Sequence, residues 1–551
     1  MRTPPGVTAS DFADVIKQFE SAVGPEWVFT SDDDLNTYRD AYSLYLGEAE
    51  ERVASAAVAP DNVEQVQAIV RIANQHRIPL YTISTGKNLG YGGSAPVYSG
   101  SVVLDLKRMN RIIEVNEENA YALVEPGVSY FDLYRYIQEK GLKLWIDCPD
   151  PGWGSLMGNA LDRGTGYTVT HLRNHFEAHC GMEVVLASGE LMRTGMGALP
   201  NSETWQQYKT GFGPYIDGMF SQSNFGIVTK MGFWLLPEPI AYFKGQILLS
   251  DYKDLIPFVP ILNYLENTGI YNGYPDIASP LLGVPQADGW IDMIDGTTKP
   301  PPPEQLELLK NLEFGYSPEL QAYGHKNKIP YWKCSLTFYG PLKVIQAQWD
   351  FAKERLSVIP GVRFEDAETV TFPLTPAQKE GVRLTDFGVP SLANFVMGAR
   401  SPINPDHPSH GHVWFSPIIP RTGAAVYEAN KVFQTAAKEM GVPLPFGFIM
   451  PVAMTERAFL CIFAFSISED PAVNKKTREI FSALIDRCAA KGWGEYRTGT
   501  IFQGQVMRGY SFNNNALLHF HETVKDAVDP NGILSAGHYG IWPKYLREKK
   551  A

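Results

Sequence analysis

The sequence has few cysteines, and their spacing matches no metal or disulfide pattern. Its 551 residues include five cysteines, and no two of them form a C-x-x-C pair. Scattered cysteines of odd number in a chain of this length indicate reduced thiols and a reducing compartment. The chain is also long enough to bury a large core, and its length predicts two to four domains, so it needs no disulfide or metal to fold.

Long apolar runs and basic clusters are missing as well. No stretch of about 18 apolar residues occurs, which excludes a membrane-spanning helix. The first twelve residues lack the apolar core of a signal peptide, so we expect a cytoplasmic protein. The formal net charge is -12 and the only basic run is the 547–550 tail, so nucleic acid is not an expected partner.

Aromatic residues are plentiful, at 12% of the chain, which fits either a large core or an aromatic-lined pocket for a flat ligand. Apolar periodicity predicts alternating strands and helices up to the Pro-, Asn- and Gly-rich stretch 243–311, where we expect a change of domain. An α+β region with an antiparallel sheet follows, and turn-rich segments follow Trp493. The expected helices are 61–76, 130–140, 341–355, 423–440 and 471–491, and the expected strands are 54–59, 78–83, 101–106, 120–125, 181–186, 190–194, 331–338 and 459–466.

Three glycine-rich segments lie near expected strands in the first half of the chain. Residues 84–93 read S-T-G-K-N-L-G-Y-G-G, and the other two segments span 149–167 and 211–230. Glycine lets backbone N–H groups approach a pyrophosphate without a Cβ in the way. The first segment lacks both G-x-G-x-x-G and G-K-S/T, so alone it fits a tight turn as well as a phosphate loop. Three glycine-rich segments near strands in one half of the chain are more than simple turns would require.

These segments resemble the vanillyl alcohol oxidase and p-cresol methylhydroxylase family of flavoenzymes. The resemblance covers nearly the whole chain and is thinnest between 243 and 400. The strings that carry it are G-K-N-L-G-Y-G-G (86–93), S-G-S-V-V-L-D (99–105), E-P-G-V (125–128), L-W-I-D-C-P-D (144–150), G-N-A-L-D-R-G-T-G-Y (158–167), G-M-E-V-V-L-A-S-G-E-L-M-R-T-G-M-G-A (181–198), G-F-G-P-Y-I-D-G-M-F-S-Q-S-N-F-G-I-V-T-K (211–230), G-W-G-E-Y-R (492–497) and D-P-N-G-I-L (529–534).

The resemblance implies an α+β fold of two domains. Residues 1–242 and 497–551 would form a discontinuous FAD-binding domain of the p-cresol methylhydroxylase type, and 243–496 a substrate or cap domain built on an antiparallel sheet. The flavin would lie at their junction, where ligand sites often occur. The residues expected to contact FAD are Gly86, Lys87, Asn88, Leu89, Gly90, Gly92, Gly93, Pro149, Gly154, Ser155, Gly158, Asn159, Gly164, Tyr167, Gly226, Ile227, Val228 and Arg497.

The resemblance assigns Tyr91, Tyr496 and Arg497 to the phenol oxygen of a substrate. A free phenol has a pKa near ~10, and a buried guanidinium with two hydroxyl donors would stabilise its phenolate. The phenolate makes the para-benzylic carbon a good hydride donor to flavin N5, which leaves a p-quinone methide. Without the resemblance, Tyr91 would be interpreted as a loop-packing aromatic and Arg497 as a surface charge.

Two acidic residues and a tryptophan complete the expected pocket. Asp150 matches the family's carboxylate near flavin N5 and would act as a base, or else it caps the turn before Pro151. Asp162 has no such role, and we expect it to be solvated or bonded within its loop. Trp414 is expected to line the substrate pocket, unless it is a core aromatic of a strand.

His412 matches the family's histidine that carries FAD through its 8α-methyl group, so we expect a covalent link there. The family's covalent members also use a base histidine in the N-terminal third, whereas the only histidine here before position 171 is His76, within an expected helix. Non-covalent FAD is the alternative. Zinc at His407, His410 and His412 is another, although only Asp406 accompanies them as a ligand-spaced residue.

His171, His175 and His179 would share one face of a helix, where they could bind a metal. The resemblance gives this segment no metal, so we expect packing or surface histidines and no metal site.

The expected reaction is FAD-dependent oxidation of a para-substituted phenol with O₂ as acceptor, which gives H₂O₂. The missing export signal favours this oxidase over a dehydrogenase or hydroxylase that passes electrons to a cytochrome. A non-catalytic flavin- or ligand-binding protein is disfavoured because Tyr91, Asp150, Tyr496 and Arg497 occur together. The short segment 199–210 predicts a homodimer, and a small phenol and O₂ are the expected partners.

Overall fold

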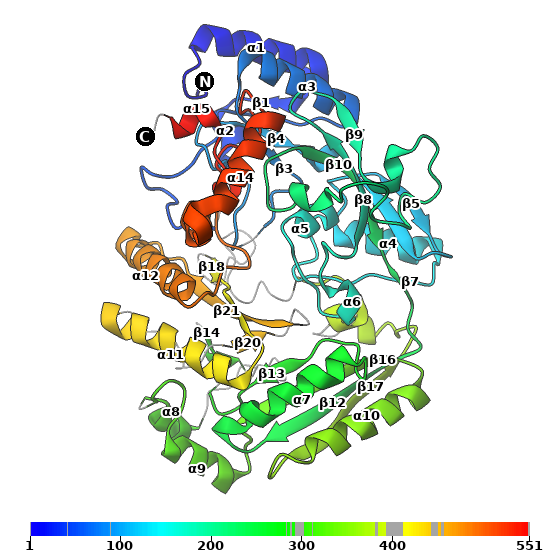
Figure 1. The fold of residues 1–551 in the computed structure, drawn as a ribbon, viewed down its shortest axis with the longest axis vertical. Coiled ribbons are helices and arrows are strands. Elements are labelled where there is room, and N and C mark those ends of the chain that lie inside the picture. The colour runs from blue at the N-terminus through cyan, green and yellow to red at the C-terminus, as the bar shows by residue number, and fades with distance from the viewer. Residues whose placement is uncertain are drawn as a thin grey trace.

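The computed structural model describes residues 2–548 apart from 41, 89, 283, 287–288, 292–301, 311, 381–383, 393–410, 442–449 and 453–456. In Figure 1 the N-terminal segment and the last helices occupy one end of the molecule, and the middle of the chain occupies the other. Helices and largely antiparallel sheets alternate in both parts, which confirms the predicted α+β class. Within the described chain, no helix combines the length and apolar character that crossing a bilayer requires.

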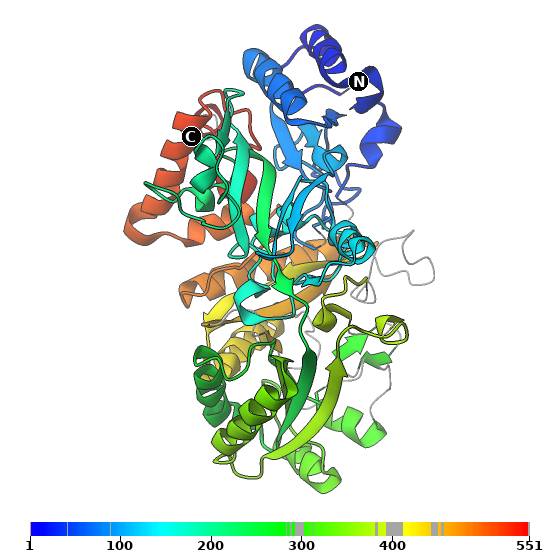
Figure 2. The ribbon, with the colours of Figure 1, turned by 90° about the vertical axis from the view of Figure 1, so that its right-hand side faces the viewer.

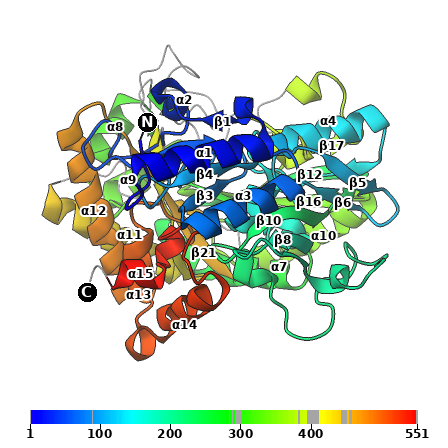
Figure 3. The same ribbon diagram turned by 90° about the horizontal axis from the view of Figure 1, so that it is seen from above.

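The first sheet is the one with parallel strands. Its order β1-β2-β4-β3 corresponds to Val28–Phe29, Ala56–Val58, Val102–Asp105 and Leu80–Ile83. Because β2 and β3 both run parallel to β4, the chain must cross over between them, and α3 (Val63–His76) makes this crossover. α1 (Ala9–Val23) lies beside α3 over this sheet (Figure 3), and the two helices share one apolar core with it.

The second sheet is antiparallel throughout. Its order β5-β6-β10-β8-β9 corresponds to Ile112–Asn116, Tyr121–Val124, Ile227–Trp234, His179–Val185 and Leu191–Arg193. β8 and β9 form the predicted hairpin, and Gly189 supplies the turn's positive φ of +81°. α4 (Tyr130–Lys140) buries Leu133 and Ile137 in the core that this sheet shares.

The middle of the chain contains two further antiparallel sheets around one core. The first, β13-β16-β12-β17, corresponds to Asp276–Ala278, Trp332–Gly340, Ala241–Leu249 and Arg363–Thr371. The second joins β18, β21, β19 and β20, at His412–Phe415, Ala458–Ser466, Ile418–Pro420 and Met450–Val452. The helices that pack on them are α7 (Leu255–Asn267), α10 (Leu342–Leu356), α11 (Gly423–Met440) and α12 (Pro471–Ala490).

Regular elements form in two segments whose composition favours turns, and the second corrects the expectation of turn-rich structure after Trp493. The stretch 243–311 begins with most of β12 and with α7, which buries Leu255, Phe258 and Leu262 although Pro260 lies inside the helix. The chain after Trp493 contains a long helix, α14 (Phe512–Val528), after α13 (Gln503–Gly509). In α7 the burial of apolar side chains outweighs the turn preference of proline, and in α14 the length of the helix outweighs that of asparagine. The remaining elements are α2 (Asp32–Asn36), β7 (Leu144–Trp145), α5 (Leu156–Leu161), α6 (Thr170–Arg173), β11 (Leu236–Pro237), β14 (Val284–Gln286), β15 (Gly289–Ile291), α8 (Pro303–Leu309), α9 (Pro318–Asn327) and α15 (Lys544–Arg547).

The end of the chain returns to the first sheet. The Leu80 N–H donates to the Ile533 carbonyl at 2.7 Å, and the Ser535 N–H donates to the Leu80 carbonyl at 2.8 Å. The buried ammonium of Lys525 donates to the Leu534 carbonyl at 2.7 Å and pairs with Asp529. In Figure 2 the last helices and the N-terminal segment lie at the same end of the molecule. The domain boundaries at 242/243 and 496/497 stay a prediction.

All five cysteines are buried free thiols: Cys148, Cys180, Cys334, Cys461 and Cys488.

Candidate active site

Segments far apart in the sequence converge on the Arg497 guanidinium. Tyr91 comes from the glycine-rich loop after β3, and Tyr496 and Arg497 follow the end of α12. The guanidinium carbon lies 4.2 Å from the centre of the Tyr91 ring and 5.7 Å from that of Tyr496. The structure therefore brings together the three side chains that the sequence assigns to a phenol oxygen.

Asp162 and Asn88 hold this guanidinium in place. Arg497 Nε donates to Asp162 Oδ2 at 2.8 Å, and Arg497 Nη2 donates to Asn88 Oδ1. Asn88 Nδ2 donates to the same Asp162 oxygen at 2.6 Å. The side chains of Arg497 and Asp162 are 10% and 12% exposed. The expectation of a solvated or loop-bonded Asp162 was wrong, because a buried guanidinium needs a counter-charge.

The site holds a guanidinium paired with Asp162, and its tyrosines stay protonated at neutral pH. Burial lowers the pKa of Arg497, but the charge of Asp162 and the neighbouring tyrosines raise it more, so the net shift is upward. Burial raises the pKa of Tyr91 and of Tyr496, and the Arg497 charge only partly opposes this. A fixed cation with two hydroxyl groups beside it can bind and stabilise an anionic oxygen.

Sequence reasoning missed Ser416 and Glu495. A hydrogen bond of 2.9 Å joins the Tyr91 hydroxyl to Ser416 Oγ, and the Ser416 N–H donates to Glu495 Oε2 at 3.0 Å. The Tyr496 N–H donates to the Ser416 carbonyl at 2.9 Å, and the Tyr496 hydroxyl donates to the Arg163 carbonyl. The only signal in the sequence was that both residues fall next to predicted site residues, in the segments around His412 and Tyr496.

The glycine-rich loop has the properties of a dinucleotide-binding loop. Gly86, Gly90 and Gly92 have φ values of +67°, +80° and +132°, which favour glycine. Among the described residues, nothing accepts a hydrogen bond from the amides of Gly86 and Lys87, so these donors are open to a ligand. Because backbone donors without a Cβ nearby suit a pyrophosphate, the loop fits FAD. Gly93 continues the same loop against Asp40, whereas Leu89 lies outside the described residues.

The second glycine-rich segment lies directly against this loop. A Cβ on Gly158 would stand 2.2 Å from Ser84 Oγ at the end of β3. Ser155 caps α5 by accepting from the Gly158 N–H at 3.1 Å, and the Asn159 amide donates to the Tyr130 hydroxyl at 3.0 Å. The side chains of Ser155, Asn159 and Asn88 are therefore all engaged with protein atoms.

The other predicted FAD contacts lie around these loops. Ile227 and Val228 begin β10 and are buried in two different apolar cores, directly after Gly226. The Gly164 N–H donates to the Asn159 carbonyl at 2.7 Å. The Tyr167 ring packs edge-on to Tyr274, with centres 5.7 Å apart. Pro149 and Gly154 are half-buried, and the exposed Lys87 places its ammonium 4.7 Å from the Trp153 ring centre.

β18 presents His412 and Trp414 to the glycine-rich loop. The Trp414 N–H donates to the Gly90 carbonyl at 3.1 Å, and a Cβ on Gly90 would meet the Trp414 ring at 2.4 Å and the His412 ring at 3.2 Å. His412 is buried with its ring centre 5.5 Å from that of Tyr42. His76 instead bonds Gln18 of α1 at 3.2 Å. The hypothetical zinc ligands His407, His410 and Asp406 lie outside the described residues.

Asp150 is half-buried in the turn before Pro151. Burial raises the pKa of the Cys148 thiol, and the nearby charges of Asp147 and Asp150 add to this. The assignment of Asp150 as a base stays a prediction.

The histidines at 171, 175 and 179 do not share a helix, because α6 ends at Arg173. His175 Nε2 lies 2.7 Å from Asp147 Oδ2, and His179 Nε2 lies 3.0 Å from Asp217 Oδ2, with all four side chains buried. No cluster of three or more potential metal ligands occurs among the residues that the structure describes. His175 and His179 are packing histidines, as predicted.

Comparison with known proteins supports a flavoprotein. A family model for an FAD binding domain matches residues 54–195. The flavoprotein subunit of 4-cresol dehydrogenase [hydroxylating] from Pseudomonas putida is 33% identical over 98% of this chain and 97% of its own. A 4-ethylphenol oxidase from Gulosibacter chungangensis, solved with isoeugenol, has a TM-score of 0.81 and 34% identity over 99% of this chain and all of its own. A p-cresol methylhydroxylase solved with substrate bound also has a TM-score of 0.81, with 31% identity over 98% and 99% of the two chains.

Proposed function

This chain belongs to the p-cresol methylhydroxylase and vanillyl alcohol oxidase family of FAD-dependent oxidoreductases, and we propose that it oxidises 4-alkylphenols at the benzylic carbon with O₂ as electron acceptor. The observation that carries the proposal is the buried Arg497 guanidinium between Tyr91 and Tyr496, next to a loop that fits FAD. The names of the relatives, which specify 4-cresol and 4-ethylphenol, support the substrate class.

When bound, FAD supplies the acceptor for the substrate's benzylic hydride. Arg497 and the two tyrosine hydroxyls hold the phenol oxygen as its anion once Tyr496 turns its O–H from the Arg163 carbonyl, and the phenol releases its proton to solvent on binding. Loss of the hydride then leaves a neutral p-quinone methide, whose oxygen the same three groups hold. Asp162 keeps the guanidinium fixed and charged throughout. Asp150 is the proposed base that removes a proton from water as it adds to the methide carbon.

The electron acceptor separates two candidate functions. The oxidase reading is supported by the 4-ethylphenol oxidase, which matches nearly the whole fold at 34% identity. A second candidate is a hydroxylating dehydrogenase that uses another electron carrier, because the Pseudomonas putida protein is 33% identical. The homodimer and the cytoplasmic location expected from the sequence stay predictions.

Reoxidation in air is the test of the oxidase. We expect 4-ethylphenol to bleach the flavin absorbance of the anaerobic holoenzyme, and air to restore it within seconds with one H₂O₂ per substrate. A flavin that stays reduced in air for minutes, but is reoxidised by an added one-electron acceptor, would make the chain a dehydrogenase. Failure of the phenol to reduce the flavin at all would contradict the substrate class.

We also propose that FAD is attached through its 8α-methyl group to His412, which is buried against the glycine-rich loop. We expect acid-precipitated protein to retain the yellow colour, and His412→Ala protein to release it into the supernatant. His325→Ala is the matched control, because this histidine is exposed on α9 and should leave the colour on the protein. Release of the flavin from the unmodified chain would refute the link.

A further inference from the structure

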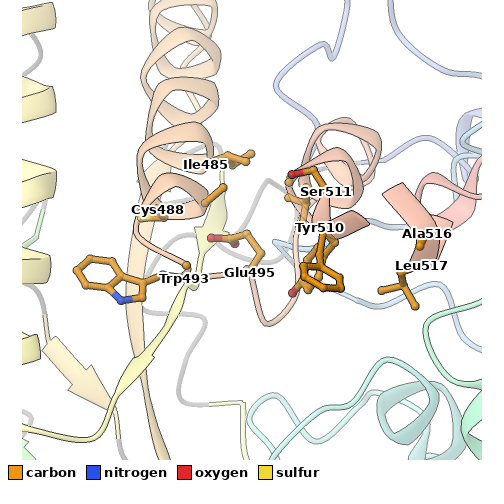
Figure 4. A pocket seen from close by; sticks show the side chains of 14 residues that line it. Ile485, Cys488, Trp493, Glu495, Tyr510, Ser511, Ala516 and Leu517 are labelled. Atoms are coloured by element: carbon orange, nitrogen blue, oxygen red, sulfur yellow. The ribbon is translucent and has the colours of Figure 1, made fainter. Parts of the chain in front are cut away.

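A second cavity lies between α12 and the helices α13 and α14 that follow it (Figure 4). Its volume is about 420 Å³, which is within the range of small-molecule sites. Tyr91, Tyr496 and Arg497 are not among the residues that line it, so it is separate from the proposed phenol site. Most of its wall is apolar, with the side chains of Ile485, Cys488, Trp493, Val506, Phe512 and Leu517.

Among the described residues that line the cavity, Glu495 is the one with an acidic side chain. The residue is only 9% exposed, and Figure 4 places it between Cys488 of α12 and Tyr510. Its Oε2 accepts from the Ser416 N–H at 3.0 Å, but its Oε1 is buried and has no hydrogen-bond partner among the described residues. A buried polar atom without a partner costs free energy, which a ligand in the cavity would recover.

The protonation of Glu495 restricts the chemistry of that ligand. Burial raises the pKa of this carboxyl well above its usual range, and the Ser416 N–H opposes the shift only in part. A carboxyl buried among apolar side chains suits a neutral hydroxyl group, which can donate to it or accept from its protonated form, better than a cation that would have to leave water. The rings of Trp493, Tyr510 and Phe512 suit a flat apolar body.

We propose that this cavity is a second binding site, for a small neutral molecule that combines an aromatic ring with a hydroxyl group. The hydroxyl bonds Glu495 Oε1, and the ring packs among the aromatic and aliphatic side chains of α12, α13 and α14. Binding here does not depend on FAD chemistry or on the reaction proposed above.

The choice of variants follows from the contacts of Glu495. Because Glu495 also bonds Ser416, which contacts Tyr91, a change at Glu495 disturbs the phenol site too. Ala516 lines the cavity from the opposite side, on the exposed surface of α14, so Ala516→Trp fills the space without touching that network. Ala527, exposed on the same helix but outside the cavity, provides the matched control Ala527→Trp.

The experiment measures binding of 2-phenylethanol to the holoenzyme by titration calorimetry. This probe has a ring and a hydroxyl but no phenol group that Arg497 could hold as an anion. We expect one saturable site, weakened at least about tenfold by Ala516→Trp and unchanged within about twofold by Ala527→Trp. Glu495→Leu, which removes the hydrogen bond, should weaken binding to a similar extent whatever it does to phenol oxidation.

Arg497→Met separates this cavity from the phenol site, since it should leave 2-phenylethanol binding intact. No saturable binding, binding that Arg497→Met removes, or binding that Ala516→Trp leaves unchanged would each overturn the proposal. If the chain failed to oxidise phenols but showed the expected binding pattern, the proposed function would fall and the second site would stand.

Discussion

Replacing Arg497 with methionine is expected to lower kcat/KM for a 4-alkylphenol at pH 7 by about 10³-fold, since only that fraction of a phenol with a pKa near ~10 is ionised in water. The guanidinium is buried against Tyr91 and is the cation proposed to stabilise the phenolate. Methionine keeps an unbranched apolar chain but no charge. Steady-state rates between pH 6 and pH 9.5 provide the measurement.

The pH profile distinguishes this role from a structural one. In Arg497→Met the substrate must arrive already ionised, so its rate should rise about tenfold per pH unit up to the phenol's own pKa. The unmodified chain should have a flatter profile, because the site itself drives the ionisation. Arg508→Met, at an exposed arginine on α13, is the control and should change neither the rate nor the profile. A loss of less than about tenfold in Arg497→Met would exclude phenolate stabilisation as the main effect.

Asp162 complicates the interpretation of Arg497→Met, because the Asp162 carboxylate loses its counter-ion in that variant. The double variant Arg497→Met/Asp162→Asn removes both charges, and it should recover stability without recovering activity. Recovery of activity in the double variant would mean that the single substitution acted through an uncompensated carboxylate rather than through the phenol.

The second large effect is expected on stability, at Glu266 of α7. Its carboxylate accepts from Arg173 Nη2 at 2.6 Å, pairs with Arg421 Nη2 at 2.5 Å and accepts from the Tyr271 hydroxyl at 2.9 Å. Glu266, Arg173 and Arg421 form a charged triad, and their side chains are at most 2% exposed. Glu266→Leu removes this carboxylate from beside two buried guanidinium groups, which should cost about 3–5 kcal/mol.

The unfolding midpoint in urea, by circular dichroism, measures this loss. Glu428→Leu is the matched control, because the Glu428–Lys491 pair is 43% and 46% exposed and should contribute less than about 1 kcal/mol. Equal midpoints for the two variants would show that the triad does not stabilise the fold. Arg173 precedes β8, while Glu266 and Arg421 belong to the middle of the chain, so the triad also ties the two halves together.

The regular elements could largely be predicted from the sequence. Helix α3 buries Val66, Ile69, Val70 and Ala73 at helical spacing, and the Asn62 side chain caps it, so a local pattern was enough. α7 could not be predicted, because its prolines normally indicate the end of a helix. Here the burial of its apolar side chains in the tertiary structure outweighs that preference. α14 begins at an Asn-rich stretch and is largely exposed, so little apolar periodicity marks it.

The site was predictable where the resemblance gives a residue in a matched string a role, and not where residues act through tertiary contacts. Tyr91, Tyr496 and Arg497 lie within such strings, and the structure brings them together. The pairing of Asp162 with Arg497 joins residues 335 positions apart, and no spacing rule encodes it. The same holds for the Tyr91–Ser416 contact, which depends on how β18 lies against the glycine-rich loop.

The buried thiols bear on how long such a catalyst would last. An oxidase releases peroxide into its own surroundings, and peroxide attacks thiolates far faster than thiols. Burial raises the pKa of all five cysteines, in the case of Cys180 to about 12. Each sulfur is therefore held protonated and out of reach of solvent, which would protect the chain against oxidative self-inactivation if it turns over as the proposed oxidase.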